Sequence, residues 1–171
     1  ASLTDQWQRE LAQKAMLPFY KSKPKPGNSG KIQHTRIYPV EYEALDNDLY
    51  SPDLNIVSSG LVSRKERFAM LRAAQPYDII LVDEAHYARR QNPRDGASAA
   101  PKYGQLYMAL QNGLRQKTKS LWMATATPMQ IDPIEVYDLF RLTKRVGPYQ
   151  YDPTLSMSYF ELMGKLVKNE P

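Results

Sequence analysis

An apolar run that ends in two acids constrains this chain more than any other feature. Residues 79–82 read Ile-Ile-Leu-Val, a pattern typical of a strand buried on both faces of a parallel sheet. Asp83 and Glu84 follow at once, so we expect both carboxylates at the carboxyl end of that strand, where open α/β sheets bind ligands. One carboxylate can hold a hydrated metal ion while the other orients or deprotonates a water. This is the chemistry that cleaves a nucleoside triphosphate.

An Asp-Glu pair alone is weak evidence, because acids also collect at strand ends and helix caps without any catalytic role. A second segment strengthens the functional interpretation. Residues 121–123 are Leu-Trp-Met and lead into residues 124–128, Ala-Thr-Ala-Thr-Pro. This is again an apolar strand pattern, and it ends in small and hydroxyl residues.

The two segments together resemble motifs II and III of the superfamily-two helicases and translocases. Residues 83–86 are Asp-Glu-Ala-His, and residues 121–130, which end in Thr-Pro-Met-Gln, look most like the Swi/Snf-type branch. Two more segments agree in order along the chain. Residues 2–11 are similar to motif Ia, and residues 55–59 are similar to the strand and hydroxyl pair that precedes motif II.

The resemblance covers residues 1–147 and implies an α/β fold, namely a partial RecA-like domain of the P-loop NTPase type. Its sheet would be mostly parallel and flanked by helices. Residues 1–148 would form this part of the ATP-binding domain, and residues 149–171 a linker and a C-terminal helix leading towards a second RecA-like domain. The family's phosphate-binding loop, Gly-x-x-x-x-Gly-Lys-Ser/Thr, has no match; residues 27–32 differ from it in spacing and position. We therefore expect a fragment of a larger motor, inactive as an ATPase by itself.

The resemblance also assigns roles at the nucleotide site, with ATP and Mg²⁺ as cofactors. Asp83 would bind Mg²⁺ through water, and Glu84 would position and polarise the attacking water. His86 would contact the nucleotide site and link it to motif III. The competing interpretation is that His86 has a purely structural role. Hydroxyl groups can relay a change in phosphate state, so Thr125 and Thr127 are the candidate hydrogen-bond partners of His86. The expected coupling group is His86, Thr125, Thr127 and Gln130.

The expected partner is nucleic acid, with double-stranded DNA as the track and RNA as the alternative. By resemblance, the contacts to its backbone would come from Gln6, Trp7, Ser58 and Ser59. Trp7 has a competing interpretation as a core residue of a helix. A net charge of +5 and a pI near 9.3 agree with a polyanionic partner and equally with an ordinary basic surface.

Composition excludes several other classes of protein. The chain has no cysteine, which excludes disulfides and thiolate metal sites, and its two histidines lie far apart, which argues against a zinc centre. No apolar stretch is long enough to cross a bilayer, so no membrane partner is expected. We expect a cytoplasmic, nucleoid-associated location.

Local patterns predict the elements between the motifs. A helix near the amino terminus should have Thr4 or Asp5 as its cap. Residues 21–30, rich in Lys, Pro and Gly, predict a mobile basic loop, and residues 41–53 an irregular acidic segment. Residues 89–102 predict a long exposed loop. The apolar stripe of that first helix would consist of Leu3, Trp7, Leu11 and Ala15.

Two capping patterns and a second stripe complete these expectations. Residues 63–66 and residues 132–135 both look like capping boxes that begin helices. Residues 36–40 and 55–57 predict short strands. A stripe that should pack in the core consists of Tyr103, Leu106, Tyr107, Leu110 and Leu114.

Two other functions compete with the motor. One is a non-catalytic nucleic-acid or protein interaction module with a degenerate helicase fold, and the other is a hydrolase that uses Asp83 and Glu84 directly on a metal. Residues 87–90 and Ile131 depart from the Swi/Snf pattern, so a restriction-type motor is as plausible as a chromatin remodeller. An incomplete sheet would expose an edge or a face, which predicts self-association.

Overall fold

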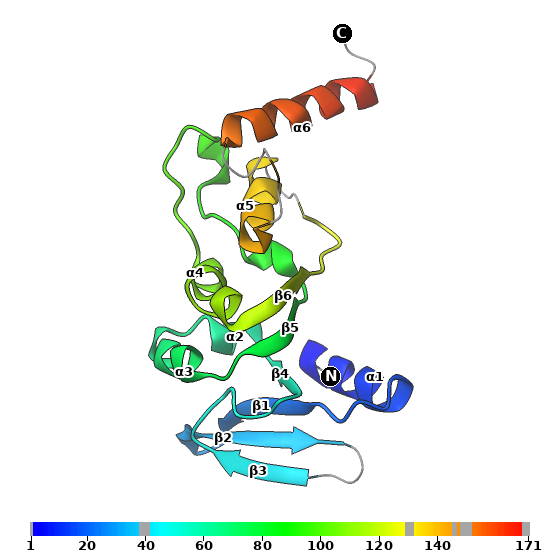
Figure 1. Ribbon diagram of the computed structural model, residues 1–171, viewed down its shortest axis with the longest axis vertical. Coiled ribbons are helices and arrows are strands. Elements are labelled where there is room, and N and C mark those ends of the chain that lie inside the picture. The colour runs from blue at the N-terminus through cyan, green and yellow to red at the C-terminus, as the bar shows by residue number, and fades with distance from the viewer. Residues whose placement is uncertain (1, 38–41, 129–131, 145–146, 148–151, 169–171) are drawn as a thin grey trace. The chain divides into compact units, whose positions relative to one another are not determined.

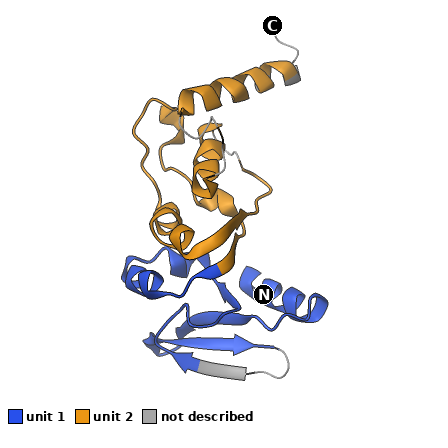
Figure 2. Cartoon of the chain, in the orientation of Figure 1, with its two compact units in different colours: residues 1–77 blue, residues 78–171 orange. Residues whose placement is uncertain are grey.

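The computed structural model of the protein describes residues 2–37, 42–128, 132–144, 147 and 152–168 (Figure 1). The chain divides into two compact units, Ala1–Tyr77 and Asp78–Pro171 (Figure 2). Each unit has its own sheet. None of the described helices is long and apolar enough to cross a membrane.

The first unit is built on a four-stranded sheet of order β3-β2-β1-β4. The antiparallel strands are β1 (Tyr20–Lys25), β2 (Asn28–Arg36) and β3 (Tyr42–Asp46), and β4 (Asn55–Val57) runs parallel to β1. The strand predicted at residues 55–57 is therefore confirmed. The helices of this unit are α1 (Leu3–Lys14), α2 (Ser59–Val62), η1 (Lys65–Arg67) and α3 (Phe68–Ala73).

Helix α1 has its N-cap two or three residues before the expected cap, Thr4 or Asp5. Ser2 is the N-cap: its hydroxyl accepts from Asp5 N at 3.3 Å, and the Asp5 carboxylate accepts from Ser2 N at 3.0 Å. The buried face is Gln8 and Ala12, whereas Leu3 is 49% exposed, so the expected stripe is wrong. Gln8 is buried because its Nε2 donates to the carbonyl of Thr35 at 2.6 Å, which satisfies a backbone acceptor at a strand end.

The expected mobile loop at residues 21–30 is instead the β1–β2 hairpin. Gly27, at φ 75°, supplies the left-handed conformation that the tight turn needs. Pro24 is tolerated because β4 pairs only with residues 20–22 of β1, so the missing amide of Pro24 faces no strand on that side. The irregular segment expected at residues 41–53 likewise contains β3. That strand ends where the Asp46 carboxylate accepts from the amides of Asn47 and Asp48.

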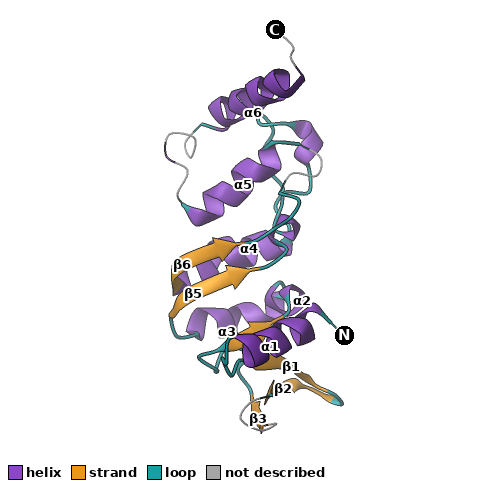
Figure 3. Ribbon diagram, turned by 90° about the vertical axis from the view of Figure 1, so that its right-hand side faces the viewer, coloured by secondary structure: helices purple, strands orange, loops and turns teal. Residues whose placement is uncertain are grey.

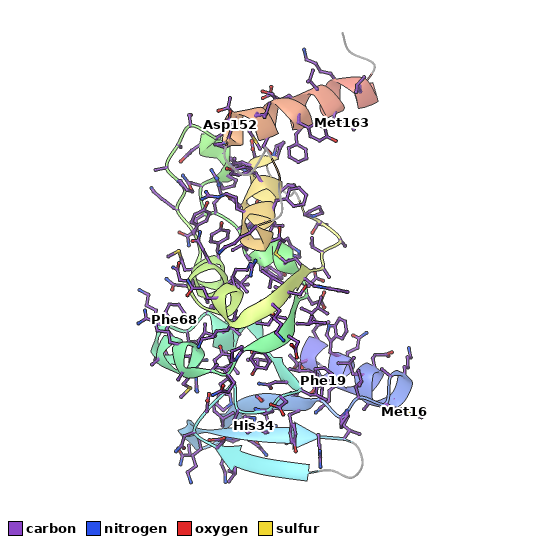
Figure 4. All side chains as sticks on the ribbon, in the orientation of Figure 1. Met16, Phe19, His34, Phe68, Asp152 and Met163 are labelled. Atoms are coloured by element: carbon purple, nitrogen blue, oxygen red, sulfur yellow. The ribbon has the colours of Figure 1, made fainter. Side chains whose placement is uncertain are left out.

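A histidine is buried in the sheet of the first unit (Figure 4). His34 is 2% exposed, with Nδ1 2.6 Å from the Ser22 hydroxyl and Nε2 3.3 Å from the Ser51 hydroxyl. Ser22 also donates to the Asn55 side-chain oxygen at 2.5 Å. Burial lowers the pKa of His34, and the nearby Asp46 opposes that shift.

Two further predictions for the first unit concern a capping box at residues 63–66 and a strand at residues 36–40. A helical segment does follow Ser63, but its N-cap residues make no side-chain cap, and the Ser63 hydroxyl donates to the Ser59 carbonyl instead. The capping box expected at residues 63–66 is therefore wrong. Of the strand expected at residues 36–40, Arg36 ends β2, and residues 38–40 lie outside the described residues.

The second unit contains a two-stranded sheet of β5 (Tyr77–Val82) and β6 (Thr118–Met123). Its helical elements are η2 (Ala85–Tyr87), η3 (Pro93–Asp95), α4 (Gln105–Asn112), η4 (Leu114–Lys117), α5 (Ile134–Thr143) and α6 (Pro153–Lys168). The Thr118 hydroxyl donates to Asp78 O at one end of the pair, and Ala124 N donates to Val82 O at the other. The two strands therefore run in the same direction, as Figure 3 shows.

Strand β5 is not buried on both faces as its sequence predicts. Ile79 is 58% exposed, Leu81 47% and Trp122 of β6 58%. A strand is enclosed only when helices cover both faces of its sheet, and within the described residues this side of the pair is uncovered.

Helix α5 begins with the reciprocal cap that its sequence predicts. Ile134 N donates to the Asp132 carboxylate at 2.9 Å, and Asp132 N donates to Glu135 at 3.3 Å. Three of the five residues of the expected core stripe, Tyr107, Leu110 and Leu114, are buried, and Tyr103 and Leu106 are half-buried.

The segment at residues 89–102 is for the most part the exposed loop that its composition predicts, because half of its residues are exposed, but it is anchored where Arg90 is buried. Arg90 is 3% exposed, forms an isolated bridge with Tyr103, and donates from Nε and Nη2 to the two carboxylate oxygens of Asp138 at 2.6 and 2.9 Å. Asp138 also accepts from the Tyr103 hydroxyl at 3.1 Å. Buried charge is retained because it is paired and hydrogen-bonded.

Helix α6 follows in the C-terminal segment and displays a row of exposed apolar residues (Figure 4, Met163). They are Leu155, Tyr159, Leu162, Met163 and Leu166.

The mixture of helices and strands confirms the α/β class. The mostly parallel sheet is not present in the described residues, where the first unit's sheet is mixed and the second unit has only two strands.

Candidate functional site

The candidate site lies in the second unit, at the carboxyl ends of β5 and β6. Ala124 N donates to Val82 O and Ala85 N donates to Ala124 O, both at 2.9 Å. These two backbone bonds extend the strand pairing beyond β5 and β6. They hold the acidic segment, residues 83–86, directly beside residues 124–127.

Glu84 adopts a backbone conformation that residues with a side chain rarely take. It is left-handed, with φ 51° and ψ 46°, and its N donates to the Asp83 carboxylate at 2.9 Å. A non-glycine residue in this region costs about 1 kcal/mol or more and often marks a functional site. The turn it makes starts η2 and leaves the side chain of Glu84 44% exposed.

His86 joins the two segments through its side chain. It is 9% exposed, and its Nδ1 lies 3.0 Å from the Thr125 hydroxyl and 3.2 Å from the Glu84 carboxylate. The Nδ1 atom of His86 therefore lies within reach of both side chains. The Thr125 hydroxyl also accepts from Thr127 N at 3.1 Å. The expected contact between His86 and Thr125 is thus confirmed, and Thr127 joins through its backbone.

The arrangement forms a continuous polar path from Glu84 through His86 to residues 125–127. Such a path can transmit a change at the acidic end to the loop after β6, because each contact depends on the position of the one before it. Gln130, the fourth member of the expected coupling group, lies outside the described residues.

Sequence reasoning missed the contacts that fix the segment after η2. Arg89 donates to Glu135 at 3.2 Å, and Arg90 forms the buried pair with Asp138 described above, so both anchor to α5. The available signal was the spacing of Glu135 and Asp138, which puts two acids on one side of the helix that follows the second motif. Both arginines are thus paired with acids of α5.

The residues at the ends of β5 and β6 could hold a magnesium ion through a single carboxylate, together with phosphate and water. Within the described part of the chain, no three His, Asp or Glu side chains are placed to hold a metal ion together. Mg²⁺ is commonly held by one or two carboxylates together with phosphate and water, and the Asp83 carboxylate suits that role. The alternative of a metal-dependent hydrolase, which needs a chelating group of side chains, gains no support.

The expected nucleic-acid contacts lie in the first unit. Gln6 and Ser59 are exposed, and Trp7 is half-buried on α1. Ser58, the N-cap residue of α2, makes no side-chain capping bond. Ser58 lines a pocket that Gln6, Trp7 and Ser59 do not reach.

The chain matches no model of a known protein family, and it matches no curated protein. The resemblance to superfamily-two motors therefore stays a prediction from the sequence motifs.

Proposed function

We propose that this chain is part of the first RecA-like domain of an ATP-dependent DNA helicase or translocase. The protein to which it belongs would hydrolyse ATP with Mg²⁺ and convert the energy into movement along nucleic acid, most simply double-stranded DNA. The observation that carries the proposal is the contact between His86 and Thr125, at 3.0 Å, because it joins the acidic segment to the segment after β6. The shared direction of β5 and β6 agrees with the parallel sheet of such a domain.

The roles follow from position and chemistry. Asp83 would hold a hydrated Mg²⁺, which neutralises phosphate charge during transfer. Glu84, whose side chain is 44% exposed, would accept a hydrogen bond from the attacking water and orient it. His86 would hold Glu84 and report its position to Thr125 and Thr127, and Gln130 would extend this coupling.

The chain by itself is proposed to be inactive as an ATPase. Binding of ATP needs a loop whose backbone amides surround the phosphates and a lysine that faces the γ-phosphate, and the printed sequence has no such loop. A second RecA-like domain would complete the active site, and the protein would work in the cytoplasm in association with the nucleoid.

A double-mutant cycle on the central contact tests the proposal in the longer protein that also carries the phosphate loop. His86→Ala, Thr125→Val and the double variant are compared for ATP turnover with and without duplex DNA. Because the two side chains act through one contact, each single change should reduce the stimulation by DNA, and the double should be no worse than the worse single.

The matched control is Ser120→Ala, on β6 outside the polar path. It should leave stimulation by DNA unchanged. Independent, additive losses from His86→Ala and Thr125→Val would refute the proposed coupling.

The rival function is a nucleic-acid or protein interaction module without turnover. Such a module would show no ATP turnover with any nucleic acid even when the longer protein is folded.

A further inference from the structure

The first unit contains a pocket of about 240 Å³ beside the start of α1, lined by several polar side chains and by Leu61. Thr4 and Asp5 of α1, Lys21 and Lys23 of β1, and Ser58 contribute to its lining. Three segments that are distant in the sequence meet here. None of the sequence patterns predicted that Lys23 and Ser58 would share a pocket, because residues 21–30 read as a loop.

Most polar groups of the pocket are already engaged within the protein. The Asp5 carboxylate pairs with the Lys21 ammonium and accepts from the Ser2 hydroxyl at 2.7 Å. These contacts hold the pKa of Asp5 well below its usual range, with the Lys21 hydrogen bond as the main cause, so the carboxylate is ionised at neutral pH. The charges of Asp5 and Lys21 therefore cancel.

Two donors of the pocket remain available for a ligand. Lys23 is exposed and has no ion-pair partner among the described residues. Ser58 is half-buried, and its hydroxyl makes no capping bond. The pocket thus presents one uncompensated positive charge and one hydroxyl, and this pair of donors suits a phosphate group.

The strand fixes where the lysine points. Side chains alternate along β1, and Ser22 is held on the buried side by His34 and Asn55. Lys23 must therefore project from the opposite face. A lysine placed by a strand loses less freedom on binding than one in a mobile loop.

We propose that this pocket seats one phosphate of a nucleic-acid backbone, with Lys23 supplying the charge and Ser58 a hydroxyl donor. The identity of the polyanion rests on the proposed function; the binding geometry does not depend on ATP hydrolysis. Lys23 of this phosphate site lies in none of the motif-like segments. The expected contacts Gln6, Trp7 and Ser59 do not line the pocket.

The test uses the chain of 171 residues and a fluorescein-labelled duplex DNA, with anisotropy measured in about 50 mM salt and then in rising salt. Lys23→Gln should weaken binding roughly threefold to tenfold and lower the slope of log affinity against log salt by about 1. Ser58→Ala should weaken binding about twofold to fivefold and leave that slope unchanged, because it removes a hydroxyl and no charge.

Lys65→Gln is the matched control, since Lys65 is an exposed lysine of the same unit outside the pocket. It should change affinity less than Lys23→Gln. Equal losses from the two lysine variants would overturn the proposal, because binding would then be diffuse attraction to a basic surface. Absence of DNA binding at low salt, in a protein folded by circular dichroism, would also overturn it.

A second arm separates the possible sources of the phosphate. Inorganic phosphate is titrated against the wild-type chain and Lys23→Gln. Binding of inorganic phosphate that depends on Lys23, without binding of DNA, would replace the nucleic acid by a small anion and refute the proposal. The binding assay contains neither ATP nor Mg²⁺, so its result does not depend on ATP hydrolysis. Failure of a longer protein to hydrolyse ATP would refute the proposed motor and would not affect the proposed phosphate site.

Discussion

Removing one partner of the buried Arg90–Asp138 pair should destabilise the second unit severely. Asp138 is fully buried and Arg90 is 3% exposed, and two hydrogen bonds of 2.6 and 2.9 Å join them. Asp138→Ala leaves a buried guanidinium with the Gly96 carbonyl as its remaining described partner, which costs about 3–5 kcal/mol. The loss of the Tyr103 hydrogen bond adds about 1 kcal/mol. Whole domains have about 5–15 kcal/mol of stability, so the change removes a large part of it.

Urea denaturation followed by far-ultraviolet circular dichroism measures this loss. Trp122 fluorescence in a Trp7→Phe background reports the second unit by itself, because these are the two tryptophans of the chain. With an m-value of about 2 kcal/mol/M, a loss of about 4 kcal/mol lowers the midpoint by about 2 M.

The double variant Arg90→Met/Asp138→Leu separates the energy of the pair from the cost of an unpaired charge. It should recover most of the stability, because an apolar pair needs no desolvation of charge. Asp78→Ala, which breaks the fully exposed pair with Lys119, should leave the midpoint almost unchanged. A loss below about 1 kcal/mol for Asp138→Ala, or a double variant as unstable as the single, would refute the reasoning.

Three further predictions concern stability and association. Burial lowers the pKa of His34 from its unfolded value of 6.5, so the stability that neutral His34 contributes is present above pH 6.5 and is lost as the pH falls towards the folded pKa. The urea midpoint of the wild type should therefore fall between pH 7.5 and 5.5, and the midpoint of His34→Gln should fall less. Parallel curves of midpoint against pH for the two proteins would contradict this. Tyr50 is 6% exposed, and its hydroxyl has no hydrogen-bond partner among the described residues; burial raises its pKa to about 12. Tyr50→Phe should therefore be neutral or stabilise by up to about 1 kcal/mol in the same assay, and a clear destabilisation would reveal a partner for the hydroxyl. The exposed Ile79, Leu81 and Trp122 predict concentration-dependent association in sedimentation velocity, and a strictly monomeric, cooperatively melting protein would count against it.

Local sequence signals predicted the elements that local chemistry controls. The cap at residues 132–135 and the stripe containing Tyr107 and Leu110 were correct, because neighbours in sequence decide both. The β1–β2 hairpin was missed because composition marks Lys, Pro and Gly as a loop, whereas pairing with β3 and β4 keeps it extended.

The same distinction holds at the candidate site. The contact between His86 and Thr125 was expected from the motifs, and the structure places it at 3.0 Å. The left-handed backbone of Glu84 was not expected, because no glycine or asparagine signals it. The pairing of Arg90 with Asp138 spans 48 positions, and nothing in either segment alone specifies it.

The most direct test of the motor is ATP turnover by the longer protein that contains the phosphate-binding loop, measured with and without duplex DNA beside its Glu84→Gln variant. Because Glu84 is proposed to orient the attacking water, the account predicts turnover that DNA stimulates and that the substitution abolishes while ATP still binds. Turnover that persists in Glu84→Gln, or a folded protein that turns over no ATP with any nucleic acid, would contradict it.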